Sequence, residues 1–341
     1  MSGAIAPTAH TGDRAHAARV SLAAIQAPVR HRLDQVVPEL HRVVVSDLPM
    51  IEQVSGHLLR MRGKLFRPTL TLLASDVEGR GEPGALTVAA AIELMHLATL
   101  VHDDSVDHSV LRRGLPTVNA LFSHQVSVIM GDFLYTRALR ALVGLNNLPV
   151  LKTLVDVANQ LTIGEMRQLA AVDALDFDEA AYVELIRCKT SSLLSGACET
   201  GALYGAPRHA PALRRYGERL GLAFQIADDL LDYTEDESVT GKPTGADLKE
   251  HKVTLPLIAA LPKLSPASRA RVDELFAEES PSDAHVADVV GIVADAGGLD
   301  YARHRGQAFA DEANEALAGL PDSPVRVALA DAIVYVMERR S

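Results

Sequence analysis

The chain has 341 residues, with 33 Lys and Arg against 44 Asp and Glu and a formal net charge of −11. This acidic balance argues against a general nucleic-acid-binding protein, which carries a basic surface. Hydrophobic residues make up 48% of the chain and aromatic residues only 4%, with no Trp, so Ala, Val and Leu must fill a large core.

The N-terminal segment carries no targeting signal. Residues 1–17 lack the apolar stretch of a signal peptide, and we expect them to be disordered. The most apolar run, 85–101, contains Glu93 and His96, so no transmembrane span is expected. Cys188 and Cys198 are ten residues apart, which fits neither a disulfide framework nor a CxxC metal site. These features predict a cytoplasmic protein with two reduced, buried thiols.

Apolar residues recur at the helical spacing i, i+3 and i+4 over most of the chain, and alternating strand patterns with hairpin turns are missing. The pattern is clear over 83–104, and Pro116 suits the first turn of a following helix that reaches about Val143. The other predicted helices span 31–48, 66–77, 148–172, 177–204, 209–236, 252–262, 267–277, 282–295, 298–318 and 324–340.

Gly and Pro separate these helices, and neither an internal repeat nor a long linker divides the chain. The predicted fold class is all-α, a single domain over residues 18–341 whose helices are too long and too apolar for a small bundle. The segment Glu237–Lys252 is polar, contains glycine and lies between apolar helices. We expect it to be a functional loop.

Two acidic clusters share the spacing D-D-x-x-D, and each follows an apolar helical segment. Positions i and i+4 of a helix share a face about 6 Å apart, so each cluster directs two carboxylates the same way. Crowded carboxylates beside apolar residues raise one another's pKa. Mg²⁺ resolves that conflict, because it binds through one or two carboxylates plus substrate phosphates. The clusters comprise Asp103, Asp104 and Asp107, and Asp228, Asp229 and Asp232.

Basic residues near the clusters supply the complementary charge. Arg side chains bind phosphate oxygens in a bidentate manner, whereas Lys acts as a movable point charge. Together with the six aspartates they predict a site for two phosphorylated ligands and several metal ions. The basic residues are Lys64, Arg67, Arg112, Arg113, Lys189, Lys242 and Lys252.

The sequence resembles the trans-isoprenyl diphosphate synthases, the polyprenyl synthetase family. The matching stretches are GKLFRP (63–68), ELMHLATLVHDDSVDHSVLRRGLPT (93–117), GDF (131–133), KT (189–190) and FQIADDLLDYTEDESVTGKPTGADLKEHKVTLP (224–256). The resemblance implies a helical bundle around a deep central cavity, usually a homodimer. Its members join an allylic diphosphate to isopentenyl diphosphate, head to tail, and release pyrophosphate. Two departures are Leu65, where Arg is common, and His251, where Gly is usual.

The resemblance also implies roles for the matching residues. Asp103, Asp107 and Asp228 would bind Mg²⁺, three ions per site, with Asp104, Asp229 and Asp232 in support. Arg112, Lys242 and Lys252 would hold the allylic diphosphate, and Lys64, Arg67, His96 and Arg113 the isopentenyl diphosphate. Lys189, Thr190 and Gln225 would lie beside the allylic substrate near the nascent cation. Released pyrophosphate is the family's favoured base, and His102 is expected to orient or pack against the metal ligands.

Product length in this family is limited by side chains on the helix that carries the first aspartates. Ala98 and Thr99 lie five and four residues before Asp103, roughly 6–7.5 Å along the helix axis. Short-chain relatives tend to place aromatic rings there, whereas these two side chains leave space. We therefore expect a product of about C30–C50, of the kind used for quinone side chains; a short-chain C15–C20 synthase is the alternative.

Three other interpretations are less consistent with the sequence. A terpene cyclase would replace the second aspartate motif with an Asn/Ser/Glu triad. A carboxylate-bridged di-iron bundle needs two E-x-x-H steps, and only Glu93–His96 is found. A non-catalytic subunit of a two-component synthase would have lost aspartate motifs that this chain keeps. A prenyltransferase remains the favoured prediction.

Overall fold

The long apolar helix α7 (Gly84–Val106) lies at the centre of the fold. It is apolar around most of its circumference, as expected for a helix enclosed by others, and it packs against α4, α6, α9 and α12. The run Ala89–Ala91 is fully buried, and its small side chains allow neighbouring helices to approach closely. This helix alone, among the described residues, is long and apolar enough to cross a membrane; two-thirds of that stretch is buried in the fold.

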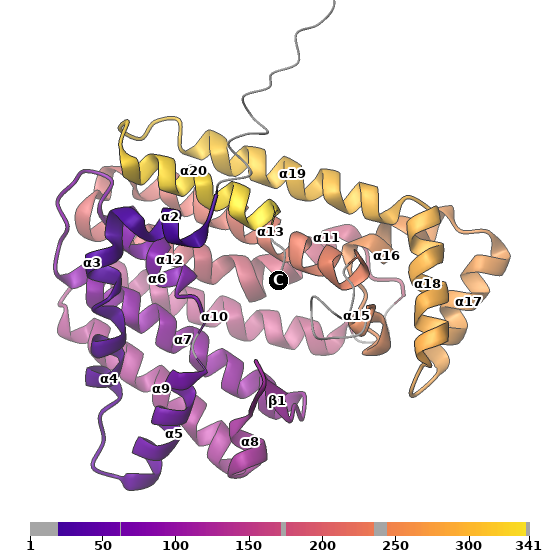
Figure 1. The fold of residues 1–341 in the computed structure, drawn as a ribbon, viewed down its shortest axis with the longest axis horizontal. Helices are drawn as coiled ribbons and strands as arrows, with labels where there is room; N and C mark the ends of the chain where they lie inside the picture. The colour runs from indigo at the N-terminus through magenta and orange to yellow at the C-terminus, as the bar shows by residue number, and fades with distance from the viewer. Residues whose placement is uncertain (1–19, 62, 172–174, 235–243, 339–341) are drawn as a thin grey trace, which may run out of the picture.

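Figure 1 shows the computed structural model, which describes residues 20–61, 63–171, 175–234 and 244–338. Residues 1–17, predicted to be disordered, lie outside the described part. The N-terminal half contains helices α2 (Leu22–Gln26), η1 (Ala27–Val29), α3 (Arg30–Leu33), α4 (Val36–Val44), α5 (Pro49–Arg60), α6 (Phe66–Ser75), α7, α8 (Val118–Leu121), α9 (His124–Gly144) and α10 (Leu148–Ala170), with strands β1 (Leu111–Arg112) and β2 (Leu115–Pro116) before α8.

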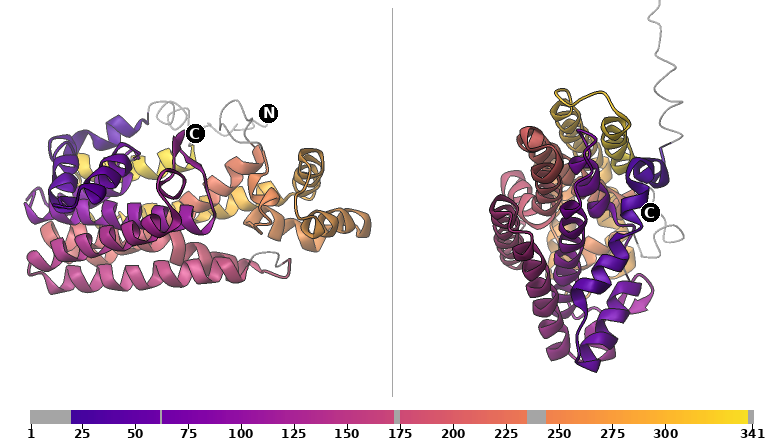
Figure 2. Two further views of the ribbon diagram at one scale, coloured as in Figure 1. Left: turned by 90° about the horizontal axis from the view of Figure 1, so that it is seen from below. Right: turned by 90° about the vertical axis from the view of Figure 1, so that its left-hand side faces the viewer.

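The C-terminal half continues the helical architecture. The long helices α7, α9, α10, α12, α13 and α19 run roughly along the long axis of the molecule, and α18 crosses that direction at one end (Figures 1 and 2). Its elements are α11 (Glu179–Ile186), η2 (Arg187–Ser191), α12 (Ser192–Gly205), η3 (Pro207–His209), α13 (Ala210–Thr234), α15 (Ala246–Lys249), α16 (Leu255–Ala260), η4 (Leu261–Lys263), α17 (Pro266–Ala277), α18 (Asp283–Asp295), α19 (Gly298–Ala316) and α20 (Pro324–Met337).

Side-chain caps fix where several of these helices begin. Ser123, Asn147 and Asp178 accept hydrogen bonds from backbone N–H groups in the first turns of α9, α10 and α11. Each such cap contributes about 1 kcal/mol, because it satisfies a donor that the helix itself leaves unpaired. Pro149, near the start of α10, has no N–H to leave unpaired.

The prediction of an all-α fold is confirmed, and most predicted helices agree with the structure to within a few residues. The helix predicted over 31–48 is divided into α3 and α4, and α5 was not predicted. Pro116 lies in β2 and not in a helix, because a hairpin separates α7 from α8. Cys188 and Cys198 are buried and free, as predicted.

Candidate active site

The hairpin after the first aspartate cluster separates the two consecutive arginines. Leu111 pairs with Pro116 and Arg112 with Leu115, so Arg113 and Gly114 form a two-residue turn. Both turn residues have positive φ, 51° and 74°, as a type I′ hairpin turn requires. Arg112 lines one cavity and Arg113 lines another. Two adjacent residues thus serve two different cavities.

The first cavity, here called the carboxylate cavity, has a volume of about 370 Å³. Both aspartate clusters contribute to it, since Asp107 comes from the end of α7 and Asp228 and Asp229 from α13. Its other polar lining residues are Arg112, Gln168, Tyr182, Lys189, Thr190, Gln225, Asp247, Lys252 and Thr254. Apolar side chains, including Phe177, Leu185 and Ile186, complete the wall. Polar groups therefore share the cavity with a surface that suits a hydrocarbon chain.

The second cavity, here called the arginine cavity, has a volume of about 410 Å³. Lys64, Arg67, His96 and Arg113, which the sequence predicts as one diphosphate site, all line it. Arg113 donates from Nη1 to the carbonyl oxygen of Met61 at 2.8 Å. A Cβ at Gly63 would lie 2.9 Å from both terminal nitrogens of Arg113, so glycine leaves room for the guanidinium.

A buried carboxylate lies within this cationic surrounding. The Glu93 side chain is 3% exposed, and burial raises its pKa while Arg67 and Arg113 oppose the shift. Burial and the same two arginines hold the pKa of His96 well below its usual range. His96 is therefore neutral near pH 7 and can donate one hydrogen bond without a charge of its own.

The carboxylate cavity has the opposite electrostatic character. Burial raises the pKa of Asp103 to about 6, although Lys189 opposes the shift. Burial and the neighbouring Asp232 raise the pKa of Asp247 to about 6 as well. Carboxylates crowded in this way favour a cation. Among the described residues no three His, Cys, Asp or Glu side chains form a ready metal cage.

The two aspartate clusters differ in how their members are engaged. Asp107 and Asp228 are exposed toward solvent, and Asp103 is partly exposed. Asp104 is buried, and its oxygens Oδ1 and Oδ2 accept from Arg112 Nε at 2.8 and 2.9 Å. Asp103, Asp107 and Asp228 are thus accessible to an incoming cation, while Asp104 is already paired with an arginine.

Asp232 has a separate task in the second cluster. Its Oδ1 and Oδ2 accept hydrogen bonds from the backbone N–H groups of Ala246 and Asp247, at 3.1 and 3.0 Å. These contacts hold the first turn of α15, whose preceding residue Gly245 has φ of 80°. Asp232 therefore fixes the described end of the predicted functional loop. Lys242 of that loop lies outside the described residues, and Lys252 lines the carboxylate cavity.

The segment that carries Lys189 and Thr190 is a short π-helix, η2, between α11 and α12. Lys189 Nζ lies 2.9 Å from Glu165 Oε2 on α10. A Cβ at Gly164 would lie 2.8 Å from the backbone nitrogen of Lys189, so glycine allows α10 to approach this turn. Single π-helical turns are common at functional sites because they redirect side chains out of the α-helical repeat.

Thr190 begins a chain of hydrogen bonds within the carboxylate cavity. Its Oγ1 donates to Gln225 Oε1 at 2.7 Å, and Gln225 Nε2 donates to Asp229 Oδ1 at 2.8 Å. The Tyr182 hydroxyl donates to Asp229 Oδ2 at 2.5 Å. Burial and Asp247 raise the pKa of Asp229, and the donated hydrogen bonds oppose that shift. Four residues from three elements are thereby joined.

His102 packs against the GDF motif of α9. A Cβ at Gly131 would lie 2.1 Å from His102 Nε2, which explains the glycine. His102 Nε2 lies 3.1 Å from the carbonyl oxygen of Val128 and 3.4 Å from Asp132 Oδ1. The ring therefore fastens the last turns of α7 to α9, beside Asp103.

The two residues predicted to influence product length have different surroundings. Ala98 is fully buried, whereas Thr99 is partly exposed and donates to the carbonyl oxygen of His96 at 2.8 Å. At 100° per residue, Thr99 lies about 40° around the helix from Asp103 and Ala98 about 140°. His96, Thr99 and Leu100, which are also partly exposed, lie within about 60° of Asp103 around the helix.

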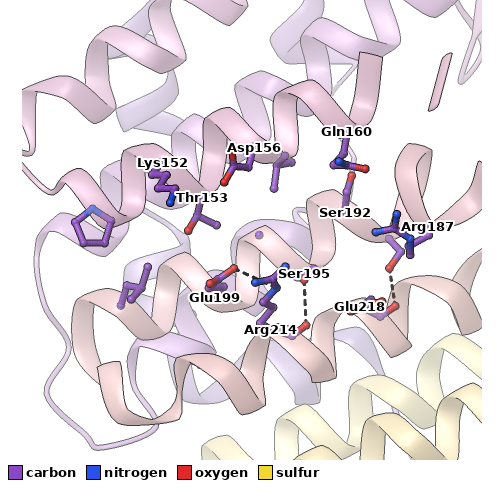
Figure 3. Close-up of a pocket in the computed structure, with 15 residues that line it drawn as sticks. Lys152, Thr153, Asp156, Gln160, Arg187, Ser192, Ser195, Glu199, Arg214 and Glu218 are labelled. Carbon is purple, nitrogen blue, oxygen red and sulfur yellow. Dashed lines mark hydrogen bonds and ion pairs between the residues drawn. The ribbon is translucent and has the colours of Figure 1, made fainter. Parts of the chain in front are cut away.

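A third cavity, of about 350 Å³, lies between α10, α12 and α13 (Figure 3). Its lining balances three cations with three carboxylates, and Arg214 Nε lies 3.8 Å from Glu199 Oε2. The charged lining residues are Lys152, Asp156, Arg187, Glu199, Arg214 and Glu218. None of the residues predicted to bind substrate or metal lines this cavity.

Sequence reasoning missed several polar residues in the two main cavities, and also Glu165, which pairs with Lys189 beside them. Glu93 was considered only as part of a di-iron motif, and Tyr182, Glu165 and Asp247 were not singled out. Asp247 lies in the GKPTGADL stretch, so its acidic side chain beside the second cluster was a usable signal. The other three depend on long-range packing, which the one-dimensional pattern does not contain.

Comparison with known proteins identifies the relatives of this chain. The polyprenyl synthetase family model matches residues 48–293. An all-trans-nonaprenyl-diphosphate synthase (geranyl-diphosphate specific) of Rhodobacter capsulatus is 39% identical over 92% of this chain and 97% of that protein. An octaprenyl diphosphate synthase of Escherichia coli is 39% identical over 83% of this chain and 88% of that protein.

Among solved structures, a polyprenyl synthase of Caulobacter crescentus complexed with calcium and isoprenyl diphosphate has a TM-score of 0.88. It is 32% identical, with 94% of this chain and 98% of that chain covered. An all-helical fold of this kind and these relatives define the class, a prenyltransferase that makes prenyl diphosphates. The chain belongs to the polyprenyl synthetase family.

Proposed function

We propose that the protein condenses isopentenyl diphosphate with an allylic diphosphate, head to tail, to make an all-trans polyprenyl diphosphate of about C30–C50. The observation that carries this proposal is the pair of adjoining cavities, one rich in carboxylates and the other in cations. Arg112 and Arg113, and likewise Phe224 and Gln225, are consecutive residues that line different cavities. Two diphosphate substrates would therefore meet at a shared wall.

The fit to Mg²⁺ follows from the donor set. Asp107 and Asp228 are exposed oxygen donors that line the carboxylate cavity, and Asp103, four residues before Asp107 on α7, is partly exposed. Burial raises the pKa of Asp103, so a cation would favour its ionised form. These carboxylates would hold a divalent cation, whose charge would offset that of the departing pyrophosphate. The protein contributes Arg112 and Lys252, which line the same cavity and are positioned to hold the allylic diphosphate.

The arginine cavity suits isopentenyl diphosphate. Lys64, Arg67 and Arg113 offer charged donors to its phosphate oxygens, and neutral His96 offers one hydrogen bond. The alkene would then attack the allylic carbon across the shared wall, where Thr190 and Gln225 present oxygens toward positive charge. Apolar side chains of the carboxylate cavity exclude water from the cation.

The length of the product is the finer part of the proposal. Two relatives that are 39% identical are named octaprenyl and nonaprenyl diphosphate synthases. In this chain Ala98 and Thr99 place no aromatic ring on the turn of helix before Asp103. We expect labelled isopentenyl diphosphate, incubated with Mg²⁺ and farnesyl or geranylgeranyl diphosphate, to give C30–C50 products on chromatography. Accumulation of C15 or C20 alone would support the short-chain alternative, and no turnover of the purified chain would support a requirement for a partner subunit.

A homodimer in the cytoplasm completes the proposal, with a product that serves as a quinone side-chain precursor. Large apolar side chains are exposed on α9 and α10, and a second copy would cover them. We expect a dimer by light scattering, and we expect Ile129→Asp with Met166→Asp to give monomers. The exposed residues are Val128, Ile129, Val143, Leu148, Val155, Ile163, Met166 and Leu169.

A further inference from the structure

Tyr182 is a tyrosine on the wall of the carboxylate cavity that the proposed chemistry does not yet use. It lies on α11, is 2% exposed and donates its hydroxyl hydrogen to Asp229 Oδ2 at 2.5 Å. This length is typical of a hydroxyl that donates to a charged carboxylate. Its hydroxyl is directed to Asp229, so a contribution of this hydroxyl to the reaction would pass through Asp229.

The hydrogen bonds that start at Asp229 have a defined direction. Gln225 Nε2 donates to Asp229 Oδ1 at 2.8 Å, which turns Gln225 Oε1 toward Thr190. Thr190 Oγ1 donates to this oxygen at 2.7 Å. Because the Thr190 hydrogen is engaged there, its oxygen lone pairs are left for the cavity. The same argument leaves the second lone pair of Gln225 Oε1 available.

Oxygen lone pairs directed into a cavity stabilise positive charge that develops there, provided they are already oriented before the reaction. A Gln amide or a Thr hydroxyl without fixed partners could rotate and present a hydrogen instead. Asp229 opposes this rotation, because each of its carboxyl oxygens already accepts a hydrogen bond, one from Gln225 Nε2 and one from Tyr182. Asp229 in turn needs a second partner on its buried side, and Tyr182 is that partner.

We infer that Tyr182 is a positioning residue that acts through Asp229 and Gln225 to orient the oxygen of Thr190 toward the allylic cation. This inference rests on the proposed function. It assigns to a buried hydroxyl of α11 an effect on the chemical step, transmitted over three hydrogen bonds to the π-helical turn. The side chain itself touches neither the reacting carbons nor the diphosphates.

The test compares two buried tyrosines that each donate one hydrogen bond. Tyr182→Phe removes the bond to Asp229, whereas Tyr216→Phe removes a 2.7 Å bond to the carbonyl oxygen of Leu329, away from both cavities. The single-turnover rate of one condensation is measured with enzyme in excess over farnesyl diphosphate. We expect about a tenfold lower rate for Tyr182→Phe, an unchanged KM for isopentenyl diphosphate, and a wild-type rate for Tyr216→Phe.

A purely structural role for Tyr182 would make the two variants alike. The inference would be overturned if Tyr182→Phe and Tyr216→Phe lost the same thermal stability and had the same single-turnover rate. Thr190→Val supplies a second measurement, because it removes the oxygen that the chain orients. We expect Tyr182→Phe to reduce the rate less in the Thr190→Val background than in the wild type. If Tyr182→Phe reduces the rate by the same factor in both backgrounds, Tyr182 acts by a route that does not include Thr190.

The proposed function and this inference fail differently. If the wild-type chain does not condense isopentenyl diphosphate with farnesyl diphosphate in the presence of Mg²⁺, the proposed function is wrong and the variants are not informative about chemistry. If the wild type turns over and Tyr182→Phe matches it, the proposed function stands and the positioning role of Tyr182 is wrong.

Discussion

The Arg112 guanidinium is bound to the buried side of the first aspartate cluster, with Nε 2.8 and 2.9 Å from the two carboxylate oxygens of Asp104. Asp104 is 5% exposed in its side chain and Arg112 29%. Removal of the arginine leaves a buried carboxylate without its partner. The resulting loss of folding stability exceeds the stability that the intact pair contributes. We expect Arg112→Met to lower the free energy of unfolding by about 2 kcal/mol, less than for a fully buried pair.

Chemical denaturation measures this effect, and an exposed ion pair provides the control. Arg303 and Asp300 lie one helical turn apart on α19 with side chains 58% and 74% exposed. We expect Arg303→Met to change the free energy of unfolding by less than about 0.5 kcal/mol. Equal effects of the two substitutions would contradict the distinction drawn here between a buried and a solvated pair.

A second prediction concerns the contact between α10 and the π-helical turn. A Cβ at Gly164 would lie 2.8 and 2.9 Å from the backbone nitrogen and Cα of Lys189, and a backbone cannot rotate away as a side chain can. We expect Gly164→Ala to separate α10 from the turn, to destabilise the protein by roughly 2–3 kcal/mol and to lower kcat by displacing Lys189 and Thr190. Gly144→Ala on α9, with no atom within 4 Å of the added Cβ, should leave both quantities near wild type.

A third prediction follows from the electrostatics of Asp103. Its pKa is raised by burial from 3.8 to about 6, so the folded protein holds this proton more tightly than the unfolded chain. As the pH rises from 4 to 6 and this carboxyl loses its proton, the free energy of unfolding should therefore fall by about 2 kcal/mol. Thermal melts of the metal-free protein should show that Asp103→Asn gains stability at pH 8 relative to wild type and loses the gain below pH 4.

Cation binding should act on the same charge. If the folded protein binds Mg²⁺ with pyrophosphate through these carboxylates, as proposed, it should bind best when the carboxylates are ionised. We expect the rise in Tm on adding both to be larger at pH 8 than at pH 5 for the wild type. For Asp103→Asn the rise should be smaller at both pH values. A rise that is the same at both pH values for the wild type would show that these carboxylates do not bind the cation.

The sequence predicted the helices and the grouping of the site residues better than it predicted local backbone geometry. Periodicity identified the core helices because a buried helix face imposes spacing on the chain. The hairpin around Arg113 was missed, because its strands are two residues long and its turn lacks the usual Asn-Gly or Asp-Gly. The π-helical turn at Lys189 also has no periodic signature.

The part of the site that could not be predicted depends on burial. Tyr182 and Asp229 are 47 residues apart and meet only through the packing of α11 on α13. The different tasks of Asp228 and Asp232 likewise follow from α15, whose first backbone N–H groups donate to Asp232 on α13. Identical residue types in one motif are therefore distinguished by neighbours that the motif does not contain.

The last prediction concerns product length. Thr99 is partly exposed and lies about 40° around α7 from Asp103, so an aromatic ring there would extend from the same face as the first aspartate. We expect Thr99→Phe to shorten the product with little loss of stability. Ala98→Phe should also shorten it, but Ala98 is fully buried, so packed neighbours must move and the protein should lose roughly 1–3 kcal/mol of stability. Thr99→Ser keeps the space and should keep the product. Chromatography measures the product length of each variant, and chemical denaturation measures its stability. Products of wild-type length in both Phe variants would place the limiting side chains elsewhere.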